Sequence, residues 1–273
     1  MSDDQTPSRR RPVRRLTGDQ AETVQDQLAA EQPLEIRLGD QPLAVTMRTP
    51  GADEDLAAGF CITEAVVTDP DEIERIEPCT LADGGNVVIV HLADEAETRG
   101  RTRHAERRSY LSSSCGLCGR ESIDRVRQAL PAPITGDFTV TQAVLSEIPA
   151  TLREHQPTFD ATGGLHAAGF FAPDGRLLIG REDVGRHNAV DKVIGAAALS
   201  GRLPLSEGVL LVSGRASFEI MQKAAMAGIA AVAAVSAPSS LAVDFAAETD
   251  MTLVGFLREN RMNVYHDPGR VSG

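Results

Sequence analysis

The chain contains no tryptophan, and only 4% of its 273 residues are aromatic. A core rich in aromatic rings is therefore excluded, and the core has to be built from Ala, Val, Leu and Ile. Apolar residues still make up 42% of the sequence, which is enough for a sizeable core and excludes global disorder. At about 100–200 residues per domain, the length allows one large domain or two small ones.

Long apolar runs are also missing. No segment approaches the ~18 uninterrupted apolar residues that a membrane span needs, so we expect none. The arginine-rich residues 8–15 resemble the start of a twin-arginine export signal, but residues 16–30 are polar and acidic and supply no apolar region. We therefore predict a flexible basic tail over residues 1–30 and a cytoplasmic protein.

Positive charge is scarce: the formal net charge is −12. This excess of acid argues against non-specific nucleic-acid binding, which needs a basic face, but it leaves room for a local basic pocket. Only Lys192 and Lys223 are lysines, and every other basic residue is arginine. Arginine suits two-pronged contacts with phosphate or carboxylate, although a high arginine content can equally reflect genome composition.

Hydrophobic patterning divides the rest of the chain into two parts. Residues 31–135 read as a β-rich part, with a hairpin over residues 33–48, a helix that begins at the acidic residues 53–55, and a strand over residues 86–90. Residues 136–273 alternate strands with helices, which is typical of a layered α/β sheet. We expect strands at 166–172, 177–179, 209–212, 229–235, 251–257 and 263–265, and helices at 144–152, 190–197, 217–227 and 240–247.

Cysteine is rare, yet two of the four cysteines stand three positions apart in the segment Ser114-Cys115-Gly116-Leu117-Cys118-Gly119. Two such thiols can share a metal, form a disulfide, or act as a nucleophile and its resolving thiol. Arginines at 101, 103, 107, 108 and 120 would stabilise a thiolate if they approach it. A turn built merely of small residues is the plainer alternative.

Two competing interpretations of this segment are weak. A structural zinc site normally needs four ligands, but Cys61 and Cys79 are isolated and the six histidines are scattered. Cys61 is interpreted as a core thiol. A thioredoxin-like protein carries its CxxC near the start of a small domain, whereas here it lies in the middle of the chain. We expect no resident metal.

Four further segments could bind a ligand: 163–169, 181–192, 213–217 and 255–265. The first surrounds His166 with small residues, and the second holds six charged residues and His187 where a strand gives way to a helix, with Asp183 as a candidate N-cap. The turn at 213–217 and arginines 258 and 261 follow strands, where open α/β sheets bind ligands. Ordinary capping, solvated charge and a charged hairpin loop explain the same patterns. None of them is a GxGxxG or Walker motif.

Taken together, the chain resembles the FdhD/NarQ family. The matching stretches are residues 47–51, 114–119, 163–171, 181–193, 212–225 and 255–265. The resemblance implies a sulfurtransferase, or sulfur carrier, that accepts sulfur from a cysteine desulfurase and delivers it to the molybdenum cofactor of formate dehydrogenase, in its bis(molybdopterin guanine dinucleotide) form. It also implies a homodimer.

The resemblance assigns roles to particular residues. Cys115 would carry the sulfur as a persulfide, and Cys118 would assist or relay it. The cofactor's dinucleotide would be contacted by Phe256, Leu257, Arg258, Glu259, Asn260 and Arg261. The implied fold is a cytidine-deaminase-like layered α/β domain with a smaller N-terminal β-rich part. Deaminase chemistry is not supported, because the CxxC precedes His166 and residue 168 is alanine. A non-catalytic cofactor-binding chaperone and a zinc-binding regulatory module remain as alternatives.

Overall fold

The computed structural model describes residues 5–79, 86–93, 130 and 133–273. The largest sheet in this part of the chain has six strands. Its central strands β10, β11 and β12 run parallel, and the outer strands pair antiparallel. Most residues of the central strands are buried aliphatics, as expected for strands covered on both faces. In order across the sheet the strands are β13 (Arg261–His266), β12 (Thr252–Arg258), β11 (Ala231–Ala234), β10 (Val209–Val212), β8 (His166–Phe171) and β9 (Leu177–Asp183).

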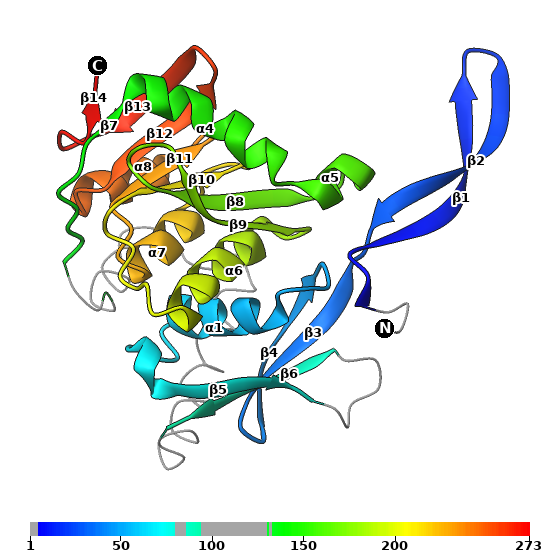
Figure 1. Cartoon of the computed structure of the whole chain (residues 1–273), viewed down its shortest axis with the longest axis horizontal. Helices are drawn as coiled ribbons and strands as arrows, with labels where there is room; N and C mark the ends of the chain where they lie inside the picture. The colour runs from blue at the N-terminus through cyan, green and yellow to red at the C-terminus, as the bar shows by residue number, and fades with distance from the viewer. Residues whose placement is uncertain (1–4, 80–85, 94–129, 131–132) are drawn as a thin grey trace.

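Helices cover the two faces of this sheet (Figure 1). One face packs against α6 (Arg186–Leu199), α7 (Phe218–Met226) and α8 (Ser240–Glu248). The other face packs against α4 (Gln142–Glu154). Alternate residues of each strand enter the two cores, since side chains of a strand point alternately to its two faces. The short α5 (Pro157–Thr162) follows α4, and β7 (Val140–Thr141) pairs with β14 (Val271–Ser272).

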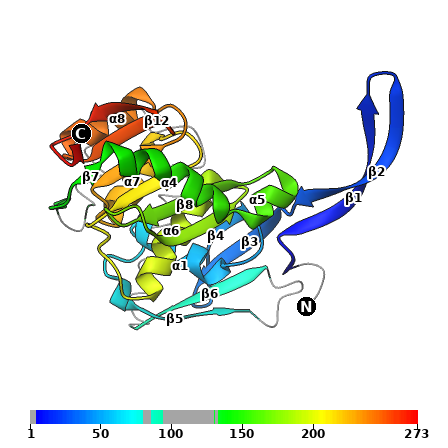
Figure 2. The same ribbon diagram turned by 45° about the horizontal axis from the view of Figure 1, so that its top comes forward.

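A second, smaller sheet lies beyond α6 (Figure 2). Helix α1 (Asp53–Thr63) separates it from α6, and residues of both helices and of this sheet share one hydrophobic core. The strand order is β4 (Gln41–Arg48), β3 (Gln32–Leu38), β6 (Val87–Leu92) and β5 (Ile73–Pro78), with the 3-10 helix η2 (Pro70–Glu72) before β5. The chain therefore stacks the small sheet, α1, the α6 layer, the large sheet and α4.

Two glycines allow α1 and α6 to touch backbone to backbone. A Cβ atom built on Gly59 would lie 1.8 Å from the carbonyl oxygen of Asp191, and one built on Gly195 would lie 1.8 Å from that of Asp55. No side chain fits at either position. The close contact brings the small sheet and α1 up to the large sheet.

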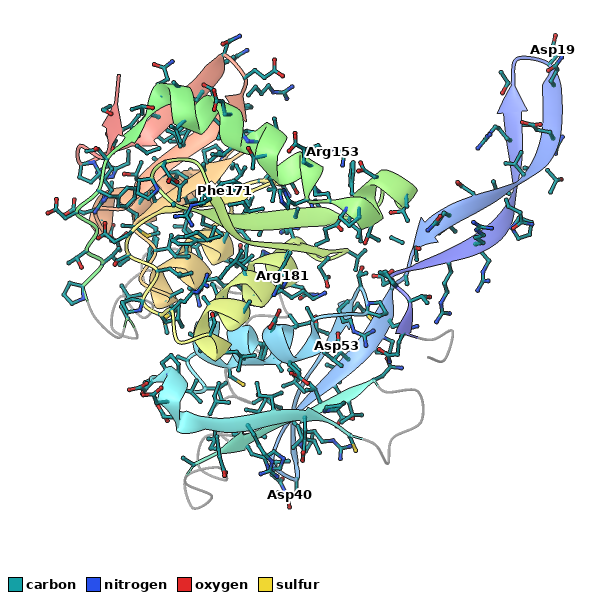
Figure 3. The ribbon with its side chains drawn as sticks, viewed as in Figure 1. Asp19, Asp40, Asp53, Arg153, Phe171 and Arg181 are labelled. Carbon is teal, nitrogen blue, oxygen red and sulfur yellow. The ribbon has the colours of Figure 1, made fainter. Side chains whose placement is uncertain are left out.

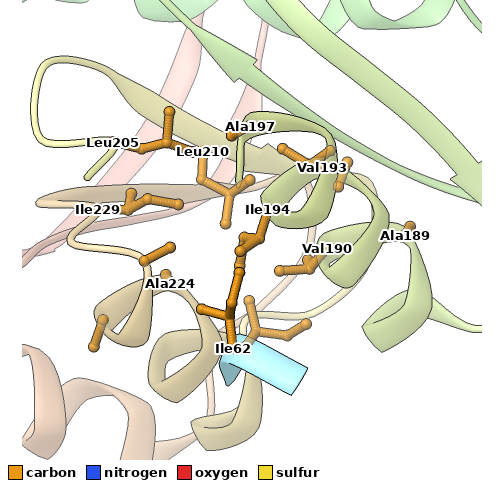
Figure 4. Packing of buried hydrophobic residues seen from close by; sticks show 14 of the residues in the cluster. Ile62, Ala189, Val190, Val193, Ile194, Ala197, Leu205, Leu210, Ala224 and Ile229 are labelled. Carbon is orange, nitrogen blue, oxygen red and sulfur yellow. The ribbon is translucent and has the colours of Figure 1, made fainter. Parts of the chain in front are cut away.

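The core between α1, α6, α7 and the large sheet is mainly aliphatic, as the lack of aromatics predicts, although Phe170, Phe218 and Phe245 belong to the same cluster. Figure 4 shows Ile62 of α1 meeting side chains of α6 and α7, among them Val190, Ile194 and Ala224. All of these except Ile62, which is 5% exposed, are fully shielded from solvent. Burial of small aliphatic side chains therefore holds the two parts of the chain together.

Residues 8–29 form a β-hairpin, whereas a flexible tail was predicted for this part of the chain. Strands β1 (Ser8–Thr17) and β2 (Gln20–Ala29) pair along their full length and project from the body (Figures 1 and 2). Figure 3 labels Asp19 at the tip. At the base of the hairpin, Ala29 lies near Gly164, whose added Cβ would stand 3.3 Å from that of Ala29.

Charge pairing and a tight turn explain this hairpin. Arg11 faces Asp26 and Arg15 faces Glu22 across the two strands, so the basic strand meets acidic residues. Gly18 has a φ of +59°, which a two-residue hairpin turn requires. The sequence pattern separated a basic segment from an acidic one, whereas the structure folds the two segments onto each other.

Most of the predicted elements are confirmed, including the 33–48 hairpin, the helix from Asp53 and the strand-helix alternation after residue 139. The short elements η2, β5, α5 and the β7–β14 pair were not predicted. The boundary predicted near residue 135 adjoins a segment outside the described residues. In the described part of the chain, no helix has the length and apolar character to cross a membrane.

Candidate functional site

A cavity of about 1160 Å³ lies where the parallel strands of the large sheet end. Ser213 follows β10, Val235 follows β11, and Leu257 and Arg258 end β12. Strand β8 runs antiparallel to β10, so His166, its first residue, reaches the same edge. The cavity therefore occupies the place where ligands of open α/β sheets bind.

This cavity brings together three segments that the sequence singled out. Gly163, Gly164 and His166 come from the first, Ser213 from the turn after β10, and the end of β12 from the third. Of the six predicted dinucleotide contacts, four line the cavity: Leu257, Arg258, Glu259 and Asn260. Phe256 and Arg261 are not among its lining residues.

The β12–β13 hairpin is irregular where it meets the cavity. The register shifts between Gly255 and Arg258, and Phe256 adopts a φ of +51°, which is uncommon for a residue with a side chain. The backbone N–H of Phe256 donates to the carbonyl of Ser236 at 3.1 Å. This bulge ends regular pairing just before the predicted contact residues and leaves Arg258, Glu259 and Asn260 exposed.

The opposite wall comes from α4 and α5, which sequence reasoning missed as a site. The guanidinium carbon of Arg153 lies 4.5 Å from the centre of the Phe159 ring, and both residues line the cavity. Figure 3 labels Arg153 at the end of α4. Backbone N–H groups of Thr158 and Phe159 donate to Glu182 at 3.0 and 2.8 Å, which fixes the start of α5. The sequence alone does not reveal that an arginine at the exposed end of a helix faces a cavity.

Leu152, Leu165, Leu211 and other apolar residues supply most of the cavity surface between these polar edges. An apolar interior with a few cations at its rim suits a ligand that has flat rings and charged groups. Arg258 and Arg153 stand on different walls, at the ends of β12 and α4.

Segment 181–192 supplies a polar scaffold beneath the cavity. The ammonium of Lys192 lies 2.7 Å from the Asp183 carboxylate, donates to the carbonyl of Thr49 at 2.9 Å, and is buried. Asp183 is not the N-cap of α6, since Gly185 takes that position; its carboxylate accepts from the backbone N–H of Gly185 at 2.8 Å and from the amide of Asn188 at 3.0 Å. This part of the segment holds the fold.

A second buried ion pair joins α6 to α7. Lys223 lies 2.9 Å from Asp191 and 3.0 Å from Glu64, and it also donates to the hydroxyl of Thr63. Burial by itself would lower the pKa of Lys223, but Asp191 and Glu64 raise it above its ordinary value, so the ammonium stays charged. Both lysines of the chain are thus buried and paired with carboxylates.

The histidines at the start of β8 and α6 are kept neutral. Burial, together with the charges of Arg186 and Lys223, lowers the pKa of His187 to about 4. Burial, followed by the charge of Arg186, also lowers the pKa of His166. Neither imidazole is cationic at neutral pH.

Two cysteines lie within the described part of the chain. Cys61 is a core thiol as predicted: it is fully buried on α1, and burial raises its pKa to about 12, so it is not reactive. Cys79 is half-buried after β5. Cys115 and Cys118 lie outside the described residues, as do the arginines around them.

The fold and the cavity define an α/β protein with a ligand-sized cavity at the carboxyl edge of its largest sheet. The sequence model of the FdhD/NarQ family matches residues 29–272. The chain belongs to this family, as its sequence motifs indicated.

Relatives and a solved structure agree with this assignment. The "Sulfur carrier protein FdhD" of Streptomyces coelicolor is 53% identical over 96% of this chain and 95% of its own length. The protein of the same name from Mycolicibacterium paratuberculosis is 50% identical over 98% of this chain and 99% of its own. A crystal structure described as a formate dehydrogenase accessory protein, from Desulfotalea psychrophila, has a TM-score of 0.77 and 24% identity and covers 97% of this chain and 99% of its own; it supports the fold alone.

Proposed function

We propose that this protein is a sulfur carrier that serves formate dehydrogenase. Its relatives with about half of their residues identical over nearly the whole chain bear the name sulfur carrier protein. Family membership covers both the segment with the CxxC pattern and the α/β part. Sulfur transfer through Cys115 is the chemistry that this sequence offers for such a role.

The sulfur acceptor we propose is the molybdenum cofactor in its bis(molybdopterin guanine dinucleotide) form, bound as a substrate. The observation that carries this assignment is the position of Arg258, Glu259 and Asn260 on the wall of the large cavity. The apolar wall would hold pterin or guanine rings, and Arg258 with Arg153 would face phosphates. Local arginines can bind a polyanion even though the chain carries a net charge of −12.

The sulfur step begins with the thiolate of Cys115. It attacks the outer sulfur of a persulfide on a cysteine desulfurase, forms a new S–S bond, and releases the desulfurase thiolate. Once the cofactor is bound, Cys118 attacks the inner sulfur of the Cys115 persulfide. The two cysteines are oxidised to a disulfide, and the outer sulfur leaves as hydrosulfide for the cofactor. A dithiol reductant returns the pair to thiols.

Intact-mass analysis tests the carrier step. The reduced protein is incubated with a cysteine desulfurase and cysteine, and the wild type should gain the mass of one sulfur atom, which a reductant removes. Cys115→Ala should gain none, whereas Cys61→Ala, which removes the buried thiol of α1, should behave as the wild type. Equal loading of Cys115→Ala and the wild type would refute the assignment.

The second candidate is a non-catalytic chaperone that binds the cofactor or the apo-enzyme. What favours it is that the apolar wall of the cavity and the arginines at its rim would hold a cofactor without any covalent step. Such a chaperone would activate formate dehydrogenase without Cys115.

We further propose that the protein is a cytoplasmic homodimer. Size-exclusion chromatography with light scattering would test the oligomeric state.

A further inference from the structure

A small polar cluster lies beside the large cavity, on the other side of the turn after β10. It contains Arg186 and His187 at the start of α6, with His166 of β8 next to them. The Nε of Arg186 and the Nε2 of His187 are shielded from solvent, and neither has a hydrogen-bond partner within the described chain. Buried polar atoms in folded proteins nearly always have a partner, so this pair calls for one.

Gly214 locates the cluster relative to the cavity. A Cβ atom built on Gly214 would lie 3.5 Å from Nδ1 of His166 and 3.7 Å from Cδ of Arg186, so these two side chains meet over this glycine. His166 and Ser213 also line the cavity. The cluster therefore adjoins the proposed cofactor site but draws on a different set of residues from the β12–β13 hairpin.

The charges around the cluster set the kind of ligand. Asp183 is paired with Lys192, and Lys223 with Asp191 and Glu64, so these groups are engaged with one another. Among the described residues, the other charged groups that act on His187 are the guanidinium of Arg186 and the exposed carboxylate of Glu219.

His187 adds no charge at neutral pH, since burial and the nearby cations oppose its protonation. A single guanidinium next to one screened carboxylate suits a monoanion. It does not suit a phosphate dianion, whose second charge would have no partner.

We propose that Arg186 and His187 form a subsite for a small sulfur monoanion, either free hydrosulfide or the terminal sulfur of a persulfide. The Nε–H of Arg186 donates to the anion, and the Nε2 of neutral His187 accepts from its S–H or, in the other tautomer, donates to the sulfur. This inference rests on the proposed function and adds to it a place where sulfur is held next to the cofactor cavity.

NMR of the imidazole nitrogens tests the subsite directly. The full chain, with its thiols reduced and oxygen excluded, is titrated with sodium hydrosulfide and, separately, with inorganic phosphate at the same ionic strength. We expect a saturable shift of the His187 nitrogen signals with hydrosulfide and none with phosphate. No shift with hydrosulfide would overturn the proposal, and equal saturation by phosphate would overturn its selectivity for sulfur.

Matched variants distinguish the loss of the subsite from a general disturbance of the fold. Arg186→Gln should weaken hydrosulfide binding at least tenfold, while Arg202→Gln, an exposed arginine just beyond the other end of α6, should leave it unchanged. Gly214→Ala adds a methyl group at ordinary contact distances from His166 and Arg186, so it should preserve folding and still weaken binding. Wild-type affinity in both Arg186→Gln and Gly214→Ala would refute the subsite.

Guanine nucleotide binding and Cys115 persulfide loading are measured on the same samples. If both persist while hydrosulfide leaves His187 unaffected, the subsite is wrong and the proposed function stands. If the wild type shows neither guanine nucleotide binding nor persulfide loading of Cys115, the proposed function itself fails.

Discussion

The backbone N–H of Thr49 donates a 3.1 Å hydrogen bond to the carboxylate of Asp183, a residue 134 positions further along the chain. Lys192 closes this link, because its ammonium contacts both the Asp183 carboxylate and the Thr49 carbonyl. Two segments that the sequence marked separately, 47–51 and 181–193, thus form one buried network. It ties the end of β4 to the edge of the large sheet.

Removing one member of this network should be costly. Lys192→Met leaves the Asp183 carboxylate buried without its cation, and we expect it to lower the free energy of unfolding by about 3–5 kcal/mol. Arg176→Met, which breaks an exposed pair at 3.9 Å, should change it by less than about 1 kcal/mol. Denaturant unfolding measures both, and an equal effect of the two changes would contradict the role given to the network.

The contact between α1 and α6 makes a second prediction. Gly59→Ala and Gly195→Ala each place a methyl group 1.8 Å from a backbone oxygen, so the helices have to separate. We expect a loss of about 2 kcal/mol or more from overpacking. Gly214→Ala, whose added methyl makes ordinary contacts, is the control. If Gly59→Ala and the control unfold at the same midpoint temperature, the two helices are not in backbone contact.

His187 makes stability depend on pH. Its pKa is about 4 in the folded protein and about 6.5 when unperturbed, so between these values the unfolded chain binds the proton and the folded chain does not. The stability that neutral His187 gives to the folded protein is fully present above about pH 6.5, and it is lost as the pH falls towards 4. It amounts to roughly 2 kcal/mol after allowance for partial exposure. His187→Asn should flatten this part of the curve.

His155→Asn, at the exposed end of α4, is the matched control for this titration. It should keep the slope of the wild type between pH 6.5 and 4 in urea unfolding experiments. An unchanged slope in His187→Asn would mean that the imidazole is protonated as easily in the folded chain as in the unfolded one.

The cavity rim is tested by nucleotide binding. Arg258→Ala combined with Arg261→Ala should weaken binding of a guanine nucleotide at least about tenfold, or about 1.4 kcal/mol. Both side chains are exposed at the β12–β13 hairpin, and Arg258 lines the cavity. Arg176→Ala combined with Arg202→Ala removes the same charge elsewhere. If calorimetry gives the two double variants the same affinity for a guanine nucleotide, the dinucleotide does not bind at this hairpin.

Regular periodicity made much of the α/β part predictable. The strand 209–212 is buried and continuous, and the helix beginning at residue 240 has its N-cap Ser239, whose hydroxyl accepts from Ala242 at 3.3 Å. The cavity lies beyond the ends of the parallel strands, where we expected a ligand, and binding of a ligand there stays a prediction. Four of the six expected contact residues line it for that reason.

Features set by distant partners were not predictable from local patterns. The N-terminal hairpin depends on Arg11 and Asp26 facing each other, and Asp183 serves Thr49 and Lys192 rather than capping its own helix. Arg153 faces the cavity only because α4 packs across the sheet. The likeness to cytidine deaminases and the roles of Cys115 and Cys118 stay predictions.

The proposed function requires that sulfur reaches formate dehydrogenase through the thiol of Cys115. The direct measurement is formate dehydrogenase activity in cells that depend on this protein and carry either the wild type or Cys115→Ala, with the amount of enzyme determined in parallel. We expect normal enzyme synthesis and no activity with Cys115→Ala. Full activity with that variant would rule out Cys115 as the sulfur carrier.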